Sequence, residues 1–351
     1  MSPLHKKKVT IRDIAERCGV STATVSYVIN GKSSRYSAET LDKIHAVMKD
    51  AGYEPDFTAR SLACGKTRLL GLILPLQEKA DRSSTLLRDN PFYSELADAI
   101  MEVAAVKGYD LIISGLRTAE ESLPWIRRRK PDGLIYLGFF PEDEKEILSS
   151  SRIPVVLIDS ETGVGAGYWH IRTDERQAAC DAVTALIQDG HSRIAFVSGP
   201  IGHSRINALR RAGWADALTT AGYEPVDSSI YEFPVSFDGG RQAAHSLLEN
   251  GLKETAVFCV ADIMAFGLMR ALSECGVAVP ERISVMGFDD IDLCRYFLPG
   301  LTTVRQDIGS KGREAARILI DSIEGLGITP DTIYIRHSIL RRGTTGPVPA
   351  L

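Results

Sequence analysis

Apolar positions recur at helical spacing in three stretches of the first fifty residues. Those expected to face a core are Ile11, Ile14, Ala15 and Cys18, then Val25, Val28 and Ile29, then Leu41, Ile44, Val47 and Met48. Thr10 and Asp13 resemble a capping box at the start of the first helix, and Gly19 is suited to end it. Two short helices joined by a turn that contains Gly predict a helix-turn-helix, with a plain three-helix packing unit as the alternative.

The rest of the chain alternates between short apolar runs and amphipathic stretches. The apolar runs are residues 69–75, 110–114, 133–137, 155–159, 194–198, 256–260 and 284–288. The amphipathic stretches are residues 92–108, 174–190, 205–222, 239–250 and 262–275. Strands that alternate with helices predict parallel α/β sheets, and their number suits two doubly wound lobes. Ligands bind such sheets at the carboxyl ends of the strands, and two lobes form a cleft between them.

The composition is that of an ordinary globular protein, with 351 residues of which 44% are hydrophobic and 25% are charged. It excludes a disordered, collagenous or coiled-coil chain. The six Cys form no CxxC pair, which argues against a disulfide scaffold and a zinc finger. No apolar run approaches the ~18 residues of a membrane helix, and the first residues lack the apolar core of a secretory signal. We therefore expect a cytoplasmic protein.

Charge is divided unevenly along the chain. Residues 1–68 contain 12 Lys and Arg against 7 Asp and Glu, a balance of +5, whereas the remainder contains 29 against 38, a balance of −9. A basic segment of domain size indicates an anionic partner, although a solvated basic tail gives the same count. A helix-turn-helix places its second helix, here the one from Ser21, in the major groove, which favours DNA. The cations expected to contact phosphate are Lys6, Lys7, Lys8, Arg12, Lys32 and Arg35.

Six short segments of the basic region resemble one known family. They are residues 9–15 (VTIRDIA), 19–21 (GVS), 23–26 (ATVS), 30–31 (NG), 52–55 (GYEP) and 59–62 (ARSL). They look like the N-terminal domain and hinge of the lactose-repressor (LacI/GalR) family. The resemblance implies a helix-turn-helix DNA-binding domain at residues 1–57 and a hinge helix or linker at residues 58–68. The DNA-binding residues it implies are Thr10, Ser21, Thr22, Ala23, Thr24, Ser26, Tyr27, Asn30, Ala59, Leu62 and Ala63.

Two of these positions bear on how the operator would be read. Leu62 holds the place of a leucine that wedges into the minor groove in this family, and apolar wedges of this kind kink the duplex. Tyr27 departs from the Arg that most members carry there. Arg makes the commonest specific contact with guanine. The resemblance therefore does not imply that this chain recognises the operator half-site sequence that is usual for the family.

The resemblance continues to about residue 343. It is carried by residues 90–93 (NPFY), 190–195 (GHSRIA), 198–200 (SGP), 210–214 (RRAGW), 261–265 (ADIMA), 279–290 (VPERISVMGFDD) and 301–304 (LTTV). It implies an α/β two-lobed core of the type I periplasmic-binding-protein fold at residues 69–343, in which the chain crosses between the lobes near residues 172, 298 and 332. The expected N-lobe is about 69–171 and 299–331, the expected C-lobe is about 172–298 and 332–343, and residues 344–351 are expected to form a flexible tail.

The effector-binding residues that the resemblance implies are Phe92, Tyr93, Asp174, Arg210 and Asp262. Four of them have a plainer interpretation. Phe92 and Tyr93 also suit core packing, Arg210 suits a surface charge, and Asp262 suits a helix N-cap. Asp289 and Asp290 are interpreted as turn or cap residues.

We expect a ligand-responsive transcriptional regulator, a repressor, that binds a pseudopalindromic operator as a homodimer and a small-molecule effector between its lobes. A sugar or sugar derivative is favoured as effector, and a purine or another metabolite is the alternative. The tail lacks the apolar heptads of a tetramerising coiled coil. An enzyme with a regulatory DNA-binding head is disfavoured, because residues 163–167 (GVGAG) fail the dinucleotide fingerprint and no phosphate loop, nucleophile elbow or metal-ligand spacing occurs. A transport-type small-molecule-binding protein is disfavoured by the predicted helix-turn-helix and by the lack of a secretory signal pattern. No cofactor, no metal and no membrane partner is expected.

Overall fold

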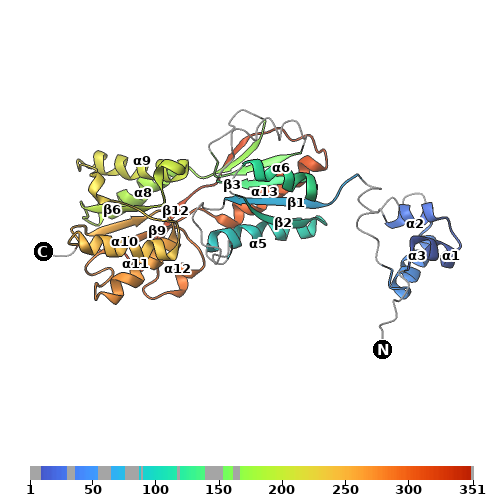
Figure 1. Ribbon diagram of the computed structural model, residues 1–351, viewed down its shortest axis with the longest axis horizontal. Coiled ribbons are helices and arrows are strands. Elements are labelled where there is room, and N and C mark those ends of the chain that lie inside the picture. The colour runs from blue at the N-terminus through green and yellow to red at the C-terminus, as the bar shows by residue number, and fades with distance from the viewer. Residues whose placement is uncertain are drawn as a thin grey trace. The chain divides into compact units, whose positions relative to one another are not determined.

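The computed structural model describes residues 9–29, 36–53, 65–75, 87, 90–116, 119–138, 153–160 and 167–348 (Figure 1). The chain divides into two compact units, Met1–Arg68 and Leu69–Leu351. The predicted boundary between DNA-binding domain and hinge, at residues 57–58, lies outside the described residues. In the part of the chain that is described, no helix is both long and apolar enough to cross a membrane.

The first unit contains the three predicted helices, α1 (Ile11–Cys18), α2 (Thr22–Ile29) and α3 (Ala38–Asp50). The predicted capping box is present, since Asp13 N donates to Thr10 Oγ1 at 3.4 Å and Thr10 N donates to Asp13 Oδ2 at 2.8 Å. Gly19 ends α1 with a φ of 69°, a left-handed conformation that suits glycine. Ile14, Val25 and Ile44 are fully buried where the three helices meet. Each helix thus buries one apolar stripe in a small common core.

The second unit contains two sheets of six strands each. The first sheet has the order β11-β5-β4-β3-β1-β2 and consists of β1 (Leu69–Pro75), β2 (Asp110–Leu116), β3 (Gly133–Leu137), β4 (Val155–Ile158), β5 (Trp169–Arg172) and β11 (Thr332–Tyr334). The second has the order β12-β10-β9-β8-β6-β7 and consists of β6 (Ile194–Ser198), β7 (Ile230–Glu232), β8 (Ala256–Cys259), β9 (Ser284–Asp289), β10 (Thr302–Arg305) and β12 (Ser338–Leu340). Neighbouring strands pair in parallel except β10 with β12.

Helices cover these sheets and define two lobes (Figure 1). The helices of the first lobe are α5 (Pro91–Val106), α6 (Ala119–Arg129) and α13 (Ile308–Ile323). Those of the second are α8 (Glu175–Gln188), α9 (Arg205–Thr220), α10 (Phe237–Glu249), α11 (Asp262–Glu274), α12 (Leu293–Tyr296) and the short 3-10 turns η2 (Ile201–His203) and η3 (Asp227–Ser229). This is the two-lobed α/β core that the strand and helix pattern predicts.

The aromatic rings of the second lobe pack in a row across its central strands. The ring centroids of Phe196 and Phe258 are 6.0 Å apart, and those of Phe258 and Phe288 are 6.3 Å apart. All three side chains are fully buried. Ring pairs at this spacing add to the stability of the apolar core. Phe288 ends this row one residue before the carboxyl end of β9, and there it contributes to the candidate site.

The chain crosses between the lobes three times, and two crossings differ from the prediction. The first follows β5 near residue 172, as expected. The second lies between β10 and α13, near residue 306 and not 298, because β10 pairs with β9 in the second sheet. The third lies between β11 and β12, near residue 336 and not 332, because β11 pairs with β5 in the first sheet. The prediction assigned β10 and β11 to the wrong lobes. Both strands are short and rich in Thr or Tyr, so no apolar run marks them in the sequence.

The segment after residue 343 is not a free tail, contrary to the prediction. Thr344 Oγ1 donates to Val285 O at 2.7 Å, Gly346 N donates to Ser284 Oγ at 3.1 Å, and Val348 N donates to Asp189 O at 3.0 Å. Backbone and hydroxyl hydrogen bonds hold this segment against the second lobe as far as residue 348. Because such bonds leave no periodic pattern of apolar residues, the sequence does not show the attachment.

His191 gives this attachment a pH dependence. The fully buried imidazole lies 2.9 Å from Thr255 Oγ1 through Nδ1 and 3.0 Å from Gly346 O through Nε2. Burial lowers the pKa of His191. The unfolded chain therefore binds a proton more readily than the folded chain, so the free energy of unfolding falls as pH drops through about 6.5.

We predict that His191→Gln reduces this loss of stability between pH 7.5 and pH 5.5. Urea unfolding of both chains at the two pH values, at constant ionic strength, measures it. His245→Gln, at an exposed position of α10, is the matched control and leaves the pH dependence as in the parent. An equal fall in stability for the parent and His191→Gln would contradict the assignment.

Candidate functional site

The second helix of the first unit exposes the residues predicted to read DNA. Val25 and Val28 point into the core, whereas Thr22, Ala23 and Tyr27 are exposed. Ala23 and Tyr27 are four residues apart and therefore share one face of α2. The helix thus presents a small residue and a large aromatic residue on its solvent side, a surface able to contact base edges and phosphates in a groove.

The hydroxyl groups at the helix starts are engaged in capping. Ser21 Oγ accepts from Thr24 N at 3.1 Å and lies 2.9 Å from Thr24 Oγ1. Thr10 Oγ1 donates to Asp13 Oδ2 at 2.8 Å. Ser26 is half-buried, and Arg12 is exposed with its Nε 3.5 Å from Glu16 Oε1. The other predicted DNA contacts lie outside the described residues: Lys6, Lys7, Lys8, Asn30, Lys32, Arg35, Ala59, Leu62 and Ala63.

In the second unit, charged side chains gather where the two lobes meet. Asp159 directly follows β4 of the first lobe, and both of its carboxylate oxygens lie 2.6 Å from Lys311 Nζ. Lys311, in the first turns of α13, is fully buried. Gln306 Oε1 accepts from the same Nζ at 2.5 Å, and Gln306 Nε2 donates to Asp289 Oδ1 at the end of β9. The Gln306 amide therefore joins a carboxylate of the second lobe to a cation of the first.

Arg210 forms a second charged pair beside Asp289. Its Nε donates to Glu175 Oε2 at 2.7 Å, its Nη1 donates to Val260 O, and its guanidinium carbon lies 3.6 Å from the ring centroid of Phe288. Arg210 and Glu175 are both buried. Burial raises the pKa of Asp289 well above its ordinary range, and the Arg210 charge opposes that rise.

Two buried oxygen atoms at this place have no hydrogen-bond partner among the described residues. They are Thr173 Oγ1, just after β5, and Glu175 Oε1, in the first turn of α8. Buried polar groups are nearly always paired, since an unpaired one costs about 1–3 kcal/mol. These atoms therefore mark where a bound molecule would complete the hydrogen bonding.

Of the two predicted aromatic residues, Tyr93 reaches the charged cluster and Phe92 belongs to the core. Their ring centroids are 6.1 Å apart in an edge-to-face arrangement at the start of α5. Phe92 is buried. Burial, and to a smaller extent the Asp289 carboxylate, raises the pKa of Tyr93 to about 12. Tyr93 of the first lobe thus lies within electrostatic reach of Asp289 of the second.

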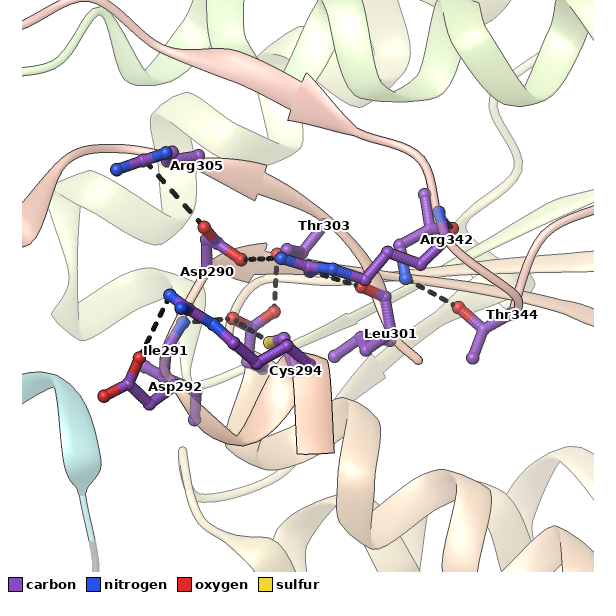
Figure 2. Close-up of polar contacts among 12 residues, drawn as sticks. Asp290, Ile291, Asp292, Cys294, Leu301, Thr303, Arg305, Arg342 and Thr344 are labelled. Atoms are coloured by element: carbon purple, nitrogen blue, oxygen red, sulfur yellow. Dashed lines mark hydrogen bonds and ion pairs between the residues drawn. The ribbon is translucent and has the colours of Figure 1, made fainter. Parts of the chain in front are cut away.

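Two predicted effector residues have other roles in the structure. Asp174 is exposed, and its Oδ1 caps α8 by accepting from Gln177 N at 3.0 Å. Asp262 is fully buried, and burial raises its pKa to about 7. Its carboxylate accepts from Thr303 Oγ1 at 2.6 Å, Ile291 N at 3.1 Å and Cys294 Sγ at 3.0 Å, three partners gathered in one place (Figure 2). This geometry supports neither residue as an effector contact, because one is a surface cap and the other has its carboxylate taken up inside its own lobe.

A second contact between the lobes lies nearby. Glu95 Oε1, on α5, accepts from Asp292 N just before α12 at 2.9 Å. Next to it, Asp290 lies between two arginines, 2.5 Å from Arg342 Nη2 and 3.9 Å from Arg305 Nε (Figure 2). These contacts place α5, which carries Tyr93, against the segment that follows Asp289.

The sequence analysis missed most of this cluster: Asp159, Glu175, Asp289, Gln306 and Lys311. Two signals for it are present in the sequence. Asp159 and Asp289 each end a short apolar run, which is where ligand-binding residues of parallel sheets occur. Lys311 interrupts the apolar stripe of α13, between Ile308 and Ala315, which indicates a buried charge with a partner. No group of three His, Cys, Asp or Glu in the described residues could hold a metal ion.

Comparison with known proteins agrees with this architecture. Residues 10–56 match the family described as bacterial regulatory proteins, lacI family, and residues 183–345 match a periplasmic binding protein-like domain. Catabolite control protein A of Priestia megaterium is 34% identical over an alignment of 345 positions, which covers 96% of this chain and 99% of the relative.

Two solved structures extend the similarity to the whole chain. The Lac repressor dimer bound to operator and the anti-inducer ONPF is similar with a TM-score of 0.82 and 28% identity, over 97% of this chain and 100% of that one. A complex of the transcriptional regulator CelR with cellobiose is similar with a TM-score of 0.70 and 26% identity, over 96% of this chain and 99% of that one. The chain belongs to the lacI family of bacterial regulatory proteins and is a ligand-controlled, DNA-binding transcriptional regulator.

Proposed function

We propose that this regulator is a repressor whose effector is a sugar or sugar derivative, bound between the lobes by Arg210, Asp289, Glu175, Thr173 and Tyr93. The observation that carries the proposal is a pair of buried oxygen atoms, Thr173 Oγ1 and Glu175 Oε1, that have no hydrogen-bond partner among the described residues. They lie beside a charged cluster that spans both lobes. Asp289 replaces Asp262 in this proposed site.

The chemistry of these groups suits hydroxyl groups. A carboxylate oxygen such as Glu175 Oε1 only accepts, and a threonine hydroxyl both donates and accepts. Sugar hydroxyls can serve both, with strong hydrogen bonds to charged partners. Lys311 is already paired with Asp159 and Arg210 with Glu175, so neither offers an uncompensated charge to a phosphate group. The CelR structure, a relative with cellobiose bound, supports the same class of ligand.

The same cluster supports a route from ligand to DNA. A ligand changes an equilibrium only through different affinities for its two states. A ligand that binds Asp289 competes with Gln306 for that carboxylate and so changes the link to Lys311 in the first lobe. We propose that the resulting lobe movement controls whether the hinge at residues 58–68 lets two DNA-binding domains meet a pseudopalindromic operator. In this proposal the homodimer acts in the cytoplasm and binds its effector without catalysis.

Asp289→Asn tests the proposed site. Asn keeps the shape and one carbonyl acceptor for Gln306, but it replaces the other carboxyl oxygen with an NH2 group, which can only donate. We expect the sugar that stabilises the parent chain to bind at least about tenfold more weakly, a loss of about 1.4 kcal/mol. Thermal shift against monosaccharides, disaccharides and purines, followed by calorimetry of the responding compound, measures this. Asp174→Asn is the control and keeps the response, because Asn caps a helix as well as Asp does. A response only to purines, or a sugar response that Asp289→Asn leaves intact, would refute the proposal.

Thr173→Val tests the unpartnered hydroxyl. Removing a buried polar atom that has no partner costs the free protein little stability, or increases it. Sugar affinity should fall by roughly tenfold, because the ligand loses a hydrogen bond. Thr303→Val is the contrasting variant. It removes a donor from buried Asp262 and should lower the free energy of unfolding by about 1–3 kcal/mol. If Thr173→Val destabilised the free protein as much as Thr303→Val does, Thr173 would be a structural residue.

A further inference from the structure

Four consecutive cations lie at the end of α6: Arg127, Arg128 and Arg129 in its last turn, and Lys130 directly after it. We call them the α6 basic run. The two residues before it, Trp125 and Ile126, are buried in the core of the first lobe, whereas all four cations are exposed. Consecutive helix residues point about 100° apart. Three exposed arginines in a row therefore mean that the end of α6 projects beyond the surface of the lobe.

Neither ion pairs with neighbouring residues nor the stabilisation of a helix C-terminus by positive charge explains why these cations are grouped here. None of the three arginines forms an ion pair within the described part of the chain, although exposed arginines elsewhere do so, such as Arg211 with Asp227 and Arg270 with Glu274. A cation near a helix C-terminus gains about 0.3–1 kcal/mol, but adjacent like charges repel each other. The run also stands in a segment, residues 69–351, whose overall balance is −9. Such a local excess of positive charge indicates an anionic partner.

The run lies at the edge of the core where the chain arrives from the first unit. Asp132, two residues after the run, donates through its N to Leu69 O at 2.8 Å. In the sheet register, Gly133 is aligned with Leu70 at the start of β1. Leu69 follows directly on Arg68, the last residue of the first unit. The α6 basic run is therefore close to the point at which the core is joined to the first unit.

We propose that the α6 basic run binds phosphate groups of the duplex that flanks the operator, so that the core adds contacts to those of the DNA-binding unit. The inference rests on the DNA binding of this regulator and adds a second contact surface to it. Arg is suited to this role because its planar guanidinium can bind phosphate with two parallel hydrogen bonds. DNA is favoured over an acidic protein, because DNA is the polyanion that this regulator binds and the DNA-binding unit is joined to the core at Leu69.

The experiment compares two duplexes and two charge-reversed variants. The first duplex is the operator that the parent chain selects from a randomised pool, and the second is the same operator extended by about ten base pairs, one helical turn, on each side. The test variant is R128E/R129E. The control is R193E/K253E, which reverses two exposed cations at the starts of β6 and β8 in the other lobe. Thermal unfolding of both variants confirms that they fold.

The parent chain should bind the extended duplex more tightly, with a steeper dependence on salt. Each phosphate contact adds about 0.9 to the slope of log affinity against log salt concentration. R128E/R129E should lower that slope by about 1–2 and weaken binding to the extended duplex by at least about tenfold, while affinity for the short operator changes less than about threefold. The control variant should bind both duplexes as the parent does.

Two results would overturn the proposal. Equal binding of the extended duplex by the parent and R128E/R129E would show that the run does not contact DNA, and would leave an acidic protein surface as its partner. An equal loss in both charge-reversed variants would show a general effect of net charge. Binding of the short operator by the parent chain separates these failures from a failure of DNA binding itself.

Discussion

A buried lysine that stays charged needs close partners, and Lys311 finds them in its own lobe and in the segment that crosses to the other lobe. Asp159 supplies the opposite charge, and the Gln306 carbonyl supplies a further acceptor. The other end of the Gln306 amide donates to Asp289 in the second lobe. The Gln306 side chain, in a segment that crosses between the lobes, therefore hydrogen-bonds to two buried ionisable side chains, Lys311 and Asp289. Movement of the lobes at this point therefore costs Asp289 or Lys311 its hydrogen bond to Gln306, unless another group replaces it.

Three other buried carboxylates, Asp262, Glu175 and Asp289, differ in what they bind. Asp262 binds Ile291, Cys294 and Thr303 and fixes the segment between β9 and β10 within one lobe. Glu175 uses one oxygen for Arg210, and its other oxygen has no hydrogen-bond partner in the part of the chain that the structure describes. Asp289 interacts both within its own lobe and across the lobe boundary. Arg210 lies near it in the second lobe, and Gln306 donates to it from the crossing segment. A ligand that contacts Asp289 therefore acts on the group that both lobes share, which explains how binding can be converted into a change of lobe arrangement.

Sequence reasoning was most successful where apolar residues repeat. The helices of the first unit and the central strands of both sheets follow from such repeats. It failed for β10, whose Thr302 and Thr303 are buried through hydroxyl hydrogen bonds, and for the segment that Thr344 and Gly346 hold by hydrogen bonds. It also chose Asp262 over Asp289. Both acidic residues stand at or just after the carboxyl end of a buried strand, and only their partners in space distinguish a structural carboxylate from one that is shared between lobes.

The central claim is that Gln306 couples the effector site to operator binding, and the ratio of operator affinities with and without saturating effector tests it most directly. Allosteric coupling of this kind typically amounts to about 5- to 150-fold. Gln306→Met removes both hydrogen bonds at similar length. The account predicts that this variant still binds operator and sugar but that the ratio falls to near one. If the variant kept the ratio of the parent chain, the lobes would be coupled elsewhere and the account would be contradicted.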